Sequence, residues 1–394
     1  MELQQLFDFL RAGVSPFHAA AHAAGLLDAA GFTRLQEADF WNLEPGRGYY
    51  ITRNQSAVIA WRMPAHAVGG WRITASHGDS PSFKIKNTAV EAAGCVKLNV
   101  EGYGGMHSAT WLDRPLSVAG RVMLRTAEGL AGRLVNLDRD LLVIPSLAPH
   151  MDRAVNEGHR YNPQVDMQPL WGPAGCRGLE DLIAEALGAD KADLVDADLT
   201  LYARQAPTVI GPDGEYFMSP RIDDLECAAT TLFGFLEAGQ DTDSACAPVW
   251  AMLDNEEVGS GTRQGAQSRF LRDTLDRIYD SVPHSGQGMQ RALANSFLLS
   301  ADNAHATHPN FADKADPANP VRMGGGIVLK VNASQKYTTN ALSGALLREI
   351  CRLAGVPVQL FANRADLPGG STLGNLQSHT LPIPMADIGL AQLG

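Results

Sequence analysis

Paired cysteines and long apolar runs are both missing from this chain of 394 residues. The five cysteines are scattered and form no CxxC pair, so the sequence indicates neither a disulfide framework nor a structural zinc knuckle. No apolar run approaches the roughly 20 residues that span a bilayer. Glu2 and Asp8 stand where a secretory signal would be basic. We therefore expect a cytoplasmic protein with reduced thiols and no membrane partner.

The chain also has little positive charge. Its 32 Lys and Arg residues stand against 43 Asp and Glu residues, and the formal net charge is −11. A nucleic-acid surface needs clustered Lys and Arg to neutralise phosphates, and no such cluster is present. We therefore expect no nucleic-acid partner, and the excess of carboxylates could instead serve cations.

Three common catalytic motifs are absent from the sequence: HExxH, GxxxxGK[ST] and GxSxG. Their absence argues against the commonest zinc-protease, P-loop and serine-hydrolase classes. The glycine-rich pieces at residues 259–261 and 324–326 lack the lysine or the helix of a phosphate-binding loop. We interpret them as flexible loops.

Strand-like and helix-like segments alternate over much of the chain. Ser15 and Pro16 are typical of a helix N-cap and first turn. Apolar runs bounded by turn residues predict strands at Tyr49–Arg53, Ala57–Arg62 and Trp71–Ser76, and apolar periodicity predicts helices at Phe17–Ala30, Leu225–Leu236, Asp273–Ser281 and Ala341–Ala354. Such alternation predicts an α/β fold with a mostly parallel sheet flanked by helices.

A segment of different character interrupts this pattern. Strand-like stretches there are separated by many turns and prolines, and they lie at Cys95–Val100, Val118–Leu124 and Leu141–Pro145. We therefore predict a catalytic domain from residues 1–90 and 212–394, with an inserted β-rich domain at residues 91–211.

Unusual polar residues follow three predicted strands, which end at Ser76, Leu253 and Ala301, and precede the predicted helix at Leu225. In an α/β sheet, loops at the carboxyl ends of the strands build the active site. The residues at these places are His77 and Asp79, Asp223, Glu256 and Glu257, and Asp302. Imidazole and carboxylate groups are ligands that suit zinc or a similar divalent ion. The sequence thus predicts a metal centre.

Adjacent carboxylates carry much of this prediction. Glu256 and Glu257 would repel one another at the mouth of a buried strand unless a cation absorbed their charge. One of them can bind the metal while the other accepts a proton from the attacking water. Asp79 can fix the ring of His77 through its other nitrogen, and Asp223 could bridge two ions spaced ~3.5–4 Å apart.

Each residue has a simpler explanation when it is taken alone. A single His at a strand end is usually structural, and Asp223 with Asp224 could cap the helix that begins at Leu225. Glu256 and Glu257 could form a solvated turn, and Asp302 could be an ordinary loop residue. Only the combination of these residues favours a metal-dependent catalytic site.

The combination resembles the aspartyl aminopeptidase family, and the match spans nearly the whole chain. The matching segments are Ser15–His18, Ala75–Pro81, Trp111–Arg114, Val143–Leu147, Ser219–Asp223, Asp254–Ser260, Ser300–Asn310, Lys330–Asn332 and Gly370–Gly374. The resemblance implies a metal-dependent aminopeptidase with a zinc exopeptidase-like fold. It would remove N-terminal residues, preferably Asp or Glu, from peptide substrates by means of a water activated by two metal ions.

The resemblance also implies a role for each site residue. His77 and Asp302 would hold one divalent ion, most simply Zn²⁺, and Glu257 the other. Asp223 would bridge the two ions, and Glu256 would be the general base.

Further residues would contact the substrate. Lys330 would meet its acidic side chain, and Tyr337 and His305 would also contact it. His150 would reach the active site of a neighbouring subunit. The family assembles into homo-oligomers that are dodecamers built from dimers, and the inserted segment would be the dimerisation domain.

One departure from the family pattern concerns the second ion. The family's last strand leads into Leu-Ala-Met-His-Ser, whose His completes the second metal site. The present sequence follows the pattern through Asp387–Leu393 and ends at Gly394, and His379 lies upstream in a predicted turn. We therefore expect the second ion to be held more weakly. Two alternatives remain open: a related two-metal aminopeptidase or deacylase of other specificity, and a truncated, catalytically impaired binding or assembly subunit.

Overall fold

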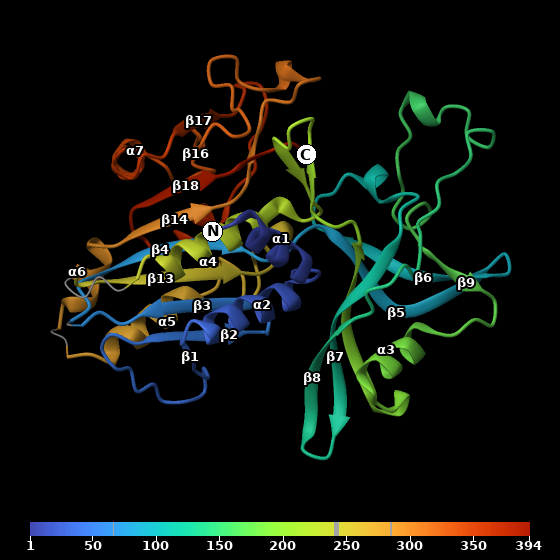
Figure 1. Ribbon diagram of the computed structural model, residues 1–394, viewed down its shortest axis with the longest axis horizontal. Helices are drawn as coiled ribbons and strands as arrows, with labels where there is room; N and C mark the ends of the chain where they lie inside the picture. The colour runs from blue at the N-terminus through green and yellow to red at the C-terminus, as the bar shows by residue number, and fades with distance from the viewer. Residues whose placement is uncertain (66, 240–243, 284–285) are drawn as a thin grey trace. The chain divides into compact units, whose positions relative to one another are not determined.

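The computed structural model describes residues 1–394 except residues 66, 240–243 and 284–285 (Figure 1). The chain forms two compact units. The first contains Met1–Asp79 and Arg221–Gly394, and the second contains Ser80–Pro220.

A nine-stranded sheet forms the centre of the first unit (Figure 1). Its order is β1-β2-β3-β13-β4-β14-β18-β16-β17. The strands are β1 (Thr33–Arg34), β2 (Gly48–Arg53), β3 (Ala57–Arg62), β4 (Gly70–His77), β13 (Cys246–Leu253), β14 (Phe297–Ala301), β16 (Ile327–Val331), β17 (Val358–Ala362) and β18 (Met385–Gly389). Neighbours are antiparallel at β2–β3, β3–β13 and β16–β18 and parallel elsewhere, so the predicted mostly parallel α/β sheet is confirmed.

Helices cover both faces of this sheet. They are α1 (Leu3–Ala12), α2 (Pro16–Ala29), α4 (Ile222–Glu237), α5 (Phe270–Asp280), α6 (Gly288–Ala294), α7 (Ala341–Ala354) and α8 (Leu373–Gln377). Val249 and Ala251 of β13 share a core with apolar residues of α5. Trp250 lies between them in sequence, and its indole donates a 3.0 Å hydrogen bond to Thr231 of α4. Because successive strand residues face opposite sides, α4 and α5 cover opposite faces.

The second unit is built on a six-stranded antiparallel sheet of order β8-β7-β10-β5-β6-β9. Its strands are β5 (Ser82–Ala92), β6 (Cys95–Tyr103), β7 (Leu116–Thr126), β8 (Gly129–Asn136), β9 (Leu170–Pro173) and β10 (Leu194–Ala203). Helix α3 (Leu179–Leu187) packs on this sheet, and a hairpin joins β11 (Thr208–Ile210) to β12 (Tyr216–Met218). The unit is therefore rich in β structure.

One predicted strand is wrong. Within Leu141–Pro145, the residues Leu142, Val143 and Ile144 form only isolated bridges. One bridge is parallel and two are antiparallel, and their partners are Leu112, Leu116 and Leu170, so they form no continuous ladder. Helices α1, α3, α6 and α8 were not predicted from the sequence. No helix in the described residues has both the length and the apolar character needed to cross a membrane.

Candidate metal centre

Adjacent strand ends bring the predicted site residues together. Strands β4 and β13 are parallel and place His77 in register with Leu253, so the loop carrying Glu256 and Glu257 starts beside His77. Strand β14 pairs with the other side of β4, and Asp302 directly follows it. Asp223 lies in the first turn of α4, which packs on β4.

Four side chains form a compact group at this edge. His77, Asp223, Asp224 and Asp302 each offer one possible ligand atom, and these atoms lie within 4.8 Å of one another. Nε2 of His77 lies 3.5 Å from Oδ1 of Asp223. Three of the four are residues that the sequence predicts as metal ligands, and Asp224 is an addition.

From the sequence alone, Asp224 is expected only to cap, together with Asp223, the helix that begins at Leu225. In the structure it is fully buried, and its Oδ2 accepts a 3.1 Å hydrogen bond from the backbone N–H of His77. The peptide bond between Asp223 and Asp224 is cis. An acidic pair at a helix start is a common pattern, so the sequence carried no signal that the second carboxylate turns inward.

Asp79 holds the other side of His77. The Nδ1 atom of His77 lies 3.0 Å from the backbone oxygen of Asp79 and 3.3 Å from its Oδ1. The carboxylate of Asp79 also accepts hydrogen bonds from the backbone N–H groups of Glu256 (3.2 Å) and Glu257 (3.1 Å). These acceptors favour a proton on Nδ1, which leaves Nε2 to face the acidic group.

The protonation states show how strongly these groups interact. Burial alone would lower the pKa of His77, but Asp224, Asp223 and Asp79 outweigh it and raise that pKa well above its usual value. Burial raises the pKa of Asp302, to which Asp223 also contributes. Burial together with Asp302 and Asp223 raises the pKa of Asp224 well above its usual range, against the opposing effect of His77. A divalent cation would relieve this repulsion, and one imidazole with several carboxylates suits zinc.

Glu256 and Glu257 are half-buried in the short 3-10 turn Glu256–Val258. Glu256 Oε2 lies 3.9 Å from Nε2 of His77, so it faces the acidic group. Burial raises the pKa of Glu256 to about 7 and that of Glu257 to about 8, and nearby carboxylates add to both shifts against the opposing effect of His77. Glu257 is not among the four residues of the compact group.

Gln392 is a neighbour of the site that the sequence did not indicate. Its side-chain amide donates a 2.8 Å hydrogen bond to Oδ2 of Asp223. It lies in the short strand β19 (Ala391–Gln392), which pairs with β15 (Ala304–His305) just after Asp302. The carboxyl group of Asp223 thus contacts His77 through one oxygen and Gln392 through the other.

The predicted substrate residues fall into three places. Lys330 is buried, and its Nζ donates a 2.9 Å hydrogen bond to the backbone oxygen of Asn303 and lies 3.8 Å from Oδ1 of Asp302. Burial would lower the pKa of Lys330, but Asp302 and other neighbours raise it. The ring of Tyr337 lies 5.5 Å from the same Nζ. His305 is exposed beside Phe361, and His150 is exposed in the second unit.

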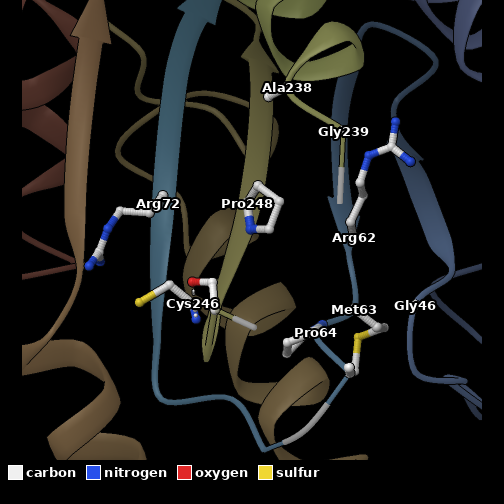
Figure 2. A pocket seen from close by; sticks show the side chains of 11 residues that line it. Gly46, Arg62, Met63, Pro64, Arg72, Ala238, Gly239, Cys246 and Pro248 are labelled. Atoms are coloured by element: carbon white, nitrogen blue, oxygen red, sulfur yellow. Dashed lines mark hydrogen bonds between the residues drawn. The ribbon is translucent and has the colours of Figure 1, made fainter. Parts of the chain in front are cut away.

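Two cavities lie away from this metal centre. One of about 220 Å³ is lined by residues at the amino ends of β4 and β13 and by Arg62 of β3 (Figure 2). Arg62 and Arg72 extend to different sides of it. Another of about 390 Å³ lies in the second unit and is lined by residues of α3 and its sheet. Neither is lined by a predicted site residue, so the chemistry of the side chains identifies the site and cavity size does not.

Comparison with known proteins supports the metal-dependent aminopeptidase that the sequence resembles. A family model described as "Aminopeptidase I zinc metalloprotease (M18)" matches residues 9–394. A "Probable M18 family aminopeptidase 2" of Clostridium acetobutylicum is 41% identical over 98% of this chain and 91% of its own length.

Solved structures are similar over the same span. In the complex of Ape4 with Nbr1, a chain that is 34% identical matches with a TM-score of 0.94, covering 98% of this chain and 79% of that one. The mApe1 dodecamer of S. cerevisiae is 26% identical, with a TM-score of 0.87, and the match covers 99% of this chain and 90% of that one.

Proposed function

This chain belongs to the M18 family of zinc aminopeptidases and is a metal-dependent hydrolase, and from that premise we propose that it releases N-terminal residues from peptides with a preference for Asp and Glu. The observation that carries the proposal is the compact group of His77, Asp223, Asp224 and Asp302, of which His77 and Asp224 are buried. Asp302 in that group lies against a buried lysine ammonium.

The residues around His77 fit the ions that the family implies. His77 and Asp302 would hold one ion, Glu257 the second, and Asp223 would be shared by both. One imidazole and several carboxylates are ligands that suit zinc or a similar divalent ion. When bound, such ions act as Lewis acids that polarise the scissile carbonyl group and lower the pKa of water.

Glu256 is the proposed general base. Its carboxylate faces His77 Nε2, and its pKa of about 7 is close to a neutral working pH. A group with such a pKa can accept a proton from the attacking water and later donate it to the departing amine. The hydrogen bonds from the Glu256 and Glu257 backbones to Asp79 hold the turn in place for this transfer.

Lys330 is the proposed source of acidic specificity. The ammonium group is buried and lies beside Asp302, so a substrate carboxylate that reached it would exchange water for a charge-assisted hydrogen bond. Tyr337 would border the same pocket, because its ring lies beside the Lys330 ammonium. His305 would contact the substrate from the exposed side.

The specificity is tested by comparing kcat/KM for Asp-, Glu-, Leu- and Lys-amide substrates with zinc-loaded protein. We expect Asp and Glu amides to be cleaved fastest. Equal or faster cleavage of the Leu amide would contradict the acidic pocket, while hydrolysis of the Leu amide would still be consistent with the family's activity.

We further propose a cytoplasmic homo-oligomer, a dodecamer built from dimers, with the second unit as the dimerisation domain. Free cysteines in the described residues fit a reducing compartment. The similarity to the mApe1 dodecamer supports the assembly. Helix α7 supports it as well, because it exposes a row of aliphatic side chains: Leu342, Leu346, Ile350 and Leu353. His150 would then act at the active site of a neighbouring subunit.

A further inference from the structure

Three neighbouring strands each carry one polar side chain at the same level of the sheet. Ser300 of β14 is in register with Asp387 of β18, and Asp387 is in register with Lys330 of β16. In-register neighbours point to the same face of a sheet. All three side chains are buried. We refer to Ser300, Asp387 and Lys330 as the polar row.

The outer members of the polar row each hold a segment that lies beyond the strands. Ser300 Oγ accepts a 3.0 Å hydrogen bond from the backbone N–H of Gly374, near the start of α8. Lys330 Nζ donates to the backbone oxygen of Asn303, in the loop that follows the predicted ligand Asp302. The row therefore connects the interior of the sheet to the border of the metal centre.

Asp387 lies in the middle of the row and joins two segments that are distant in sequence. Its Oδ2 accepts hydrogen bonds from both the backbone N–H and the hydroxyl of Thr338, each at 2.5 Å. Its Oδ1 accepts a hydrogen bond from the hydroxyl of Thr372. Its own backbone N–H donates to Oγ1 of Thr339 at 2.8 Å. Asp387 thus ties residues 338–339 to residue 372 through its carboxylate and its backbone N–H.

The packing around this carboxylate is tight on the side of Gly374. A Cβ atom on Gly374 would lie only 2.9 Å from Oδ1 of Asp387 and 2.9 Å from Cβ of Ser300. Real Cβ atoms essentially never approach so closely, so the carboxylate is enclosed on that side. Its position is fixed by contacts on several sides.

We propose that Asp387 is a positioning residue that holds the Thr338 and Thr372 segments together beside Lys330 and so sets the geometry of the pocket for the substrate side chain. Tyr337 immediately precedes Thr338, whose backbone and hydroxyl are both bound to Asp387. The position of the Tyr337 ring beside the Lys330 ammonium therefore depends on Asp387, the strand neighbour of Lys330. This inference rests on the proposed function, in which Lys330 and Tyr337 contact the substrate.

The test uses zinc-loaded full-length protein and the pair Thr338→Ala and Thr338→Ser. The alanine variant loses one hydrogen bond to a buried charge, which should change the ratio of kcat/KM for Glu and Leu amides by about 10-fold or more. The serine variant keeps the hydroxyl and should stay within about 2-fold of the parent ratio. An unchanged ratio in Thr338→Ala, or an equal change in Thr338→Ser, would overturn the inference.

A second readout separates this inference from the proposed function. In Asp387→Asn, hydrogen exchange should become faster in residues 332–340 and also in residues 363–372, because both lose an anchor. If Asp387→Asn does not fold, Thr372→Val removes one of the same hydrogen bonds and should make exchange faster in residues 363–372. Exchange that stays at the parent rate in both segments would overturn the role of Asp387. Failure of the parent protein to cleave any amide would instead overturn the proposed function, while the exchange result would still decide whether Asp387 ties the segments.

Discussion

At the scale of single residues, the site depends on which nitrogen of His77 faces the acidic group. Asp79 binds the Nδ1 side of the ring, so the carboxylates lie near Nε2. Asp79 also binds the backbone of Glu256 and Glu257. A single buried carboxylate therefore fixes both the proposed metal ligand and the proposed base.

Replacing Glu256 by Gln tests the assignment of the base. The amide cannot accept the proton, so we expect kcat to fall by roughly 10²–10⁴-fold. Bound zinc should be unchanged, because Glu256 is not assigned as a ligand. The matched variant Glu257→Gln should instead lower the zinc content. If Glu256→Gln kept its turnover with its metal intact, another group would have to be the base.

Replacing Lys330 by Met tests the source of specificity. The substitution keeps the length of the side chain and removes its charge, and a lost charge pair of about 2 kcal/mol corresponds to roughly 30-fold in kcat/KM for a Glu amide. The Leu amide should be affected less. Lys336 is exposed next to Tyr337, so Lys336→Met is the control and should change neither rate. An equal loss on both substrates in Lys330→Met would mean that Lys330 is structural.

At the scale of elements, the strands and helices with strong apolar patterns were predictable. The helix Ala341–Ala354 and the strand Ala57–Arg62 have the predicted bounds, because caps and turn residues mark their ends. The segment Leu141–Pro145 has the composition of a strand but no continuous partner. Pairing depends on distant residues, so local pattern could not reveal this difference.

The site was also predictable only where a local pattern in the sequence marks its residues. Strand ends identified His77 and Asp302, a helix start identified Asp223, and the structure brings all three into one group. Asp224 and Gln392 join that site through a local turn and through the pairing of two short strands. Neither feature leaves a periodic signal in the sequence. The roles assigned to all of these residues stay predictions until they are measured.

His18 in helix α2 should make the folded chain less stable in acid. Burial lowers the pKa of His18 to about 4 from its usual 6.5, and its Nδ1 lies 2.8 Å from Oγ of the N-cap Ser15. The unfolded chain therefore binds a proton at a higher pH than the folded chain does. This contribution to stability is complete above about pH 6.5 and is lost as pH falls toward 4.

The change His18→Asn removes this titration while leaving a polar group near Ser15. Between pH 7.5 and pH 5, the free energy of unfolding of the parent should fall by about 2 kcal/mol more than that of the variant. Urea denaturation at the two pH values measures the difference. His107→Asn, at an exposed position in the second unit, is the control and should behave like the parent. If the free energy of unfolding had the same pH dependence in the parent and in His18→Asn, the lowered pKa of His18 would be contradicted.

At the scale of the whole molecule, helix α7 has two apolar sides. Leu347 and Cys351 are buried against the sheet, while Leu342 and Leu353 are 74% and 72% exposed. A 14-residue helix is only about 21 Å long, so its exposed side would cover less than the ~800 Å² per partner of a standard interface. We therefore expect α7 to form one contact among several in an assembly of identical chains.

The double variant Leu346→Glu with Ile350→Glu should weaken that assembly. Charges on both aliphatic positions would have to be buried without partners, so light scattering should show a smaller mass than the parent at equal concentration. Ala345→Glu places the same charge on an exposed position of α7 next to Leu346 in sequence and should leave the mass unchanged. A parent protein that is an active monomer would contradict the proposed oligomer, and an unchanged mass of the double variant would exclude α7 from its contacts.

The central claim is that the carboxylates gathered around His77 hold the metal that makes this chain a peptidase. The most direct measurement is the rate of hydrolysis of a Glu amide by chelator-treated protein as Zn²⁺ is returned, with bound zinc determined in the same samples. We expect no activity in the metal-free protein and a rate that rises in step with bound zinc. The variant Asp302→Asn should bind less zinc and recover correspondingly less activity. Full activity in the metal-free protein, or full zinc binding and activity in Asp302→Asn, would contradict the account.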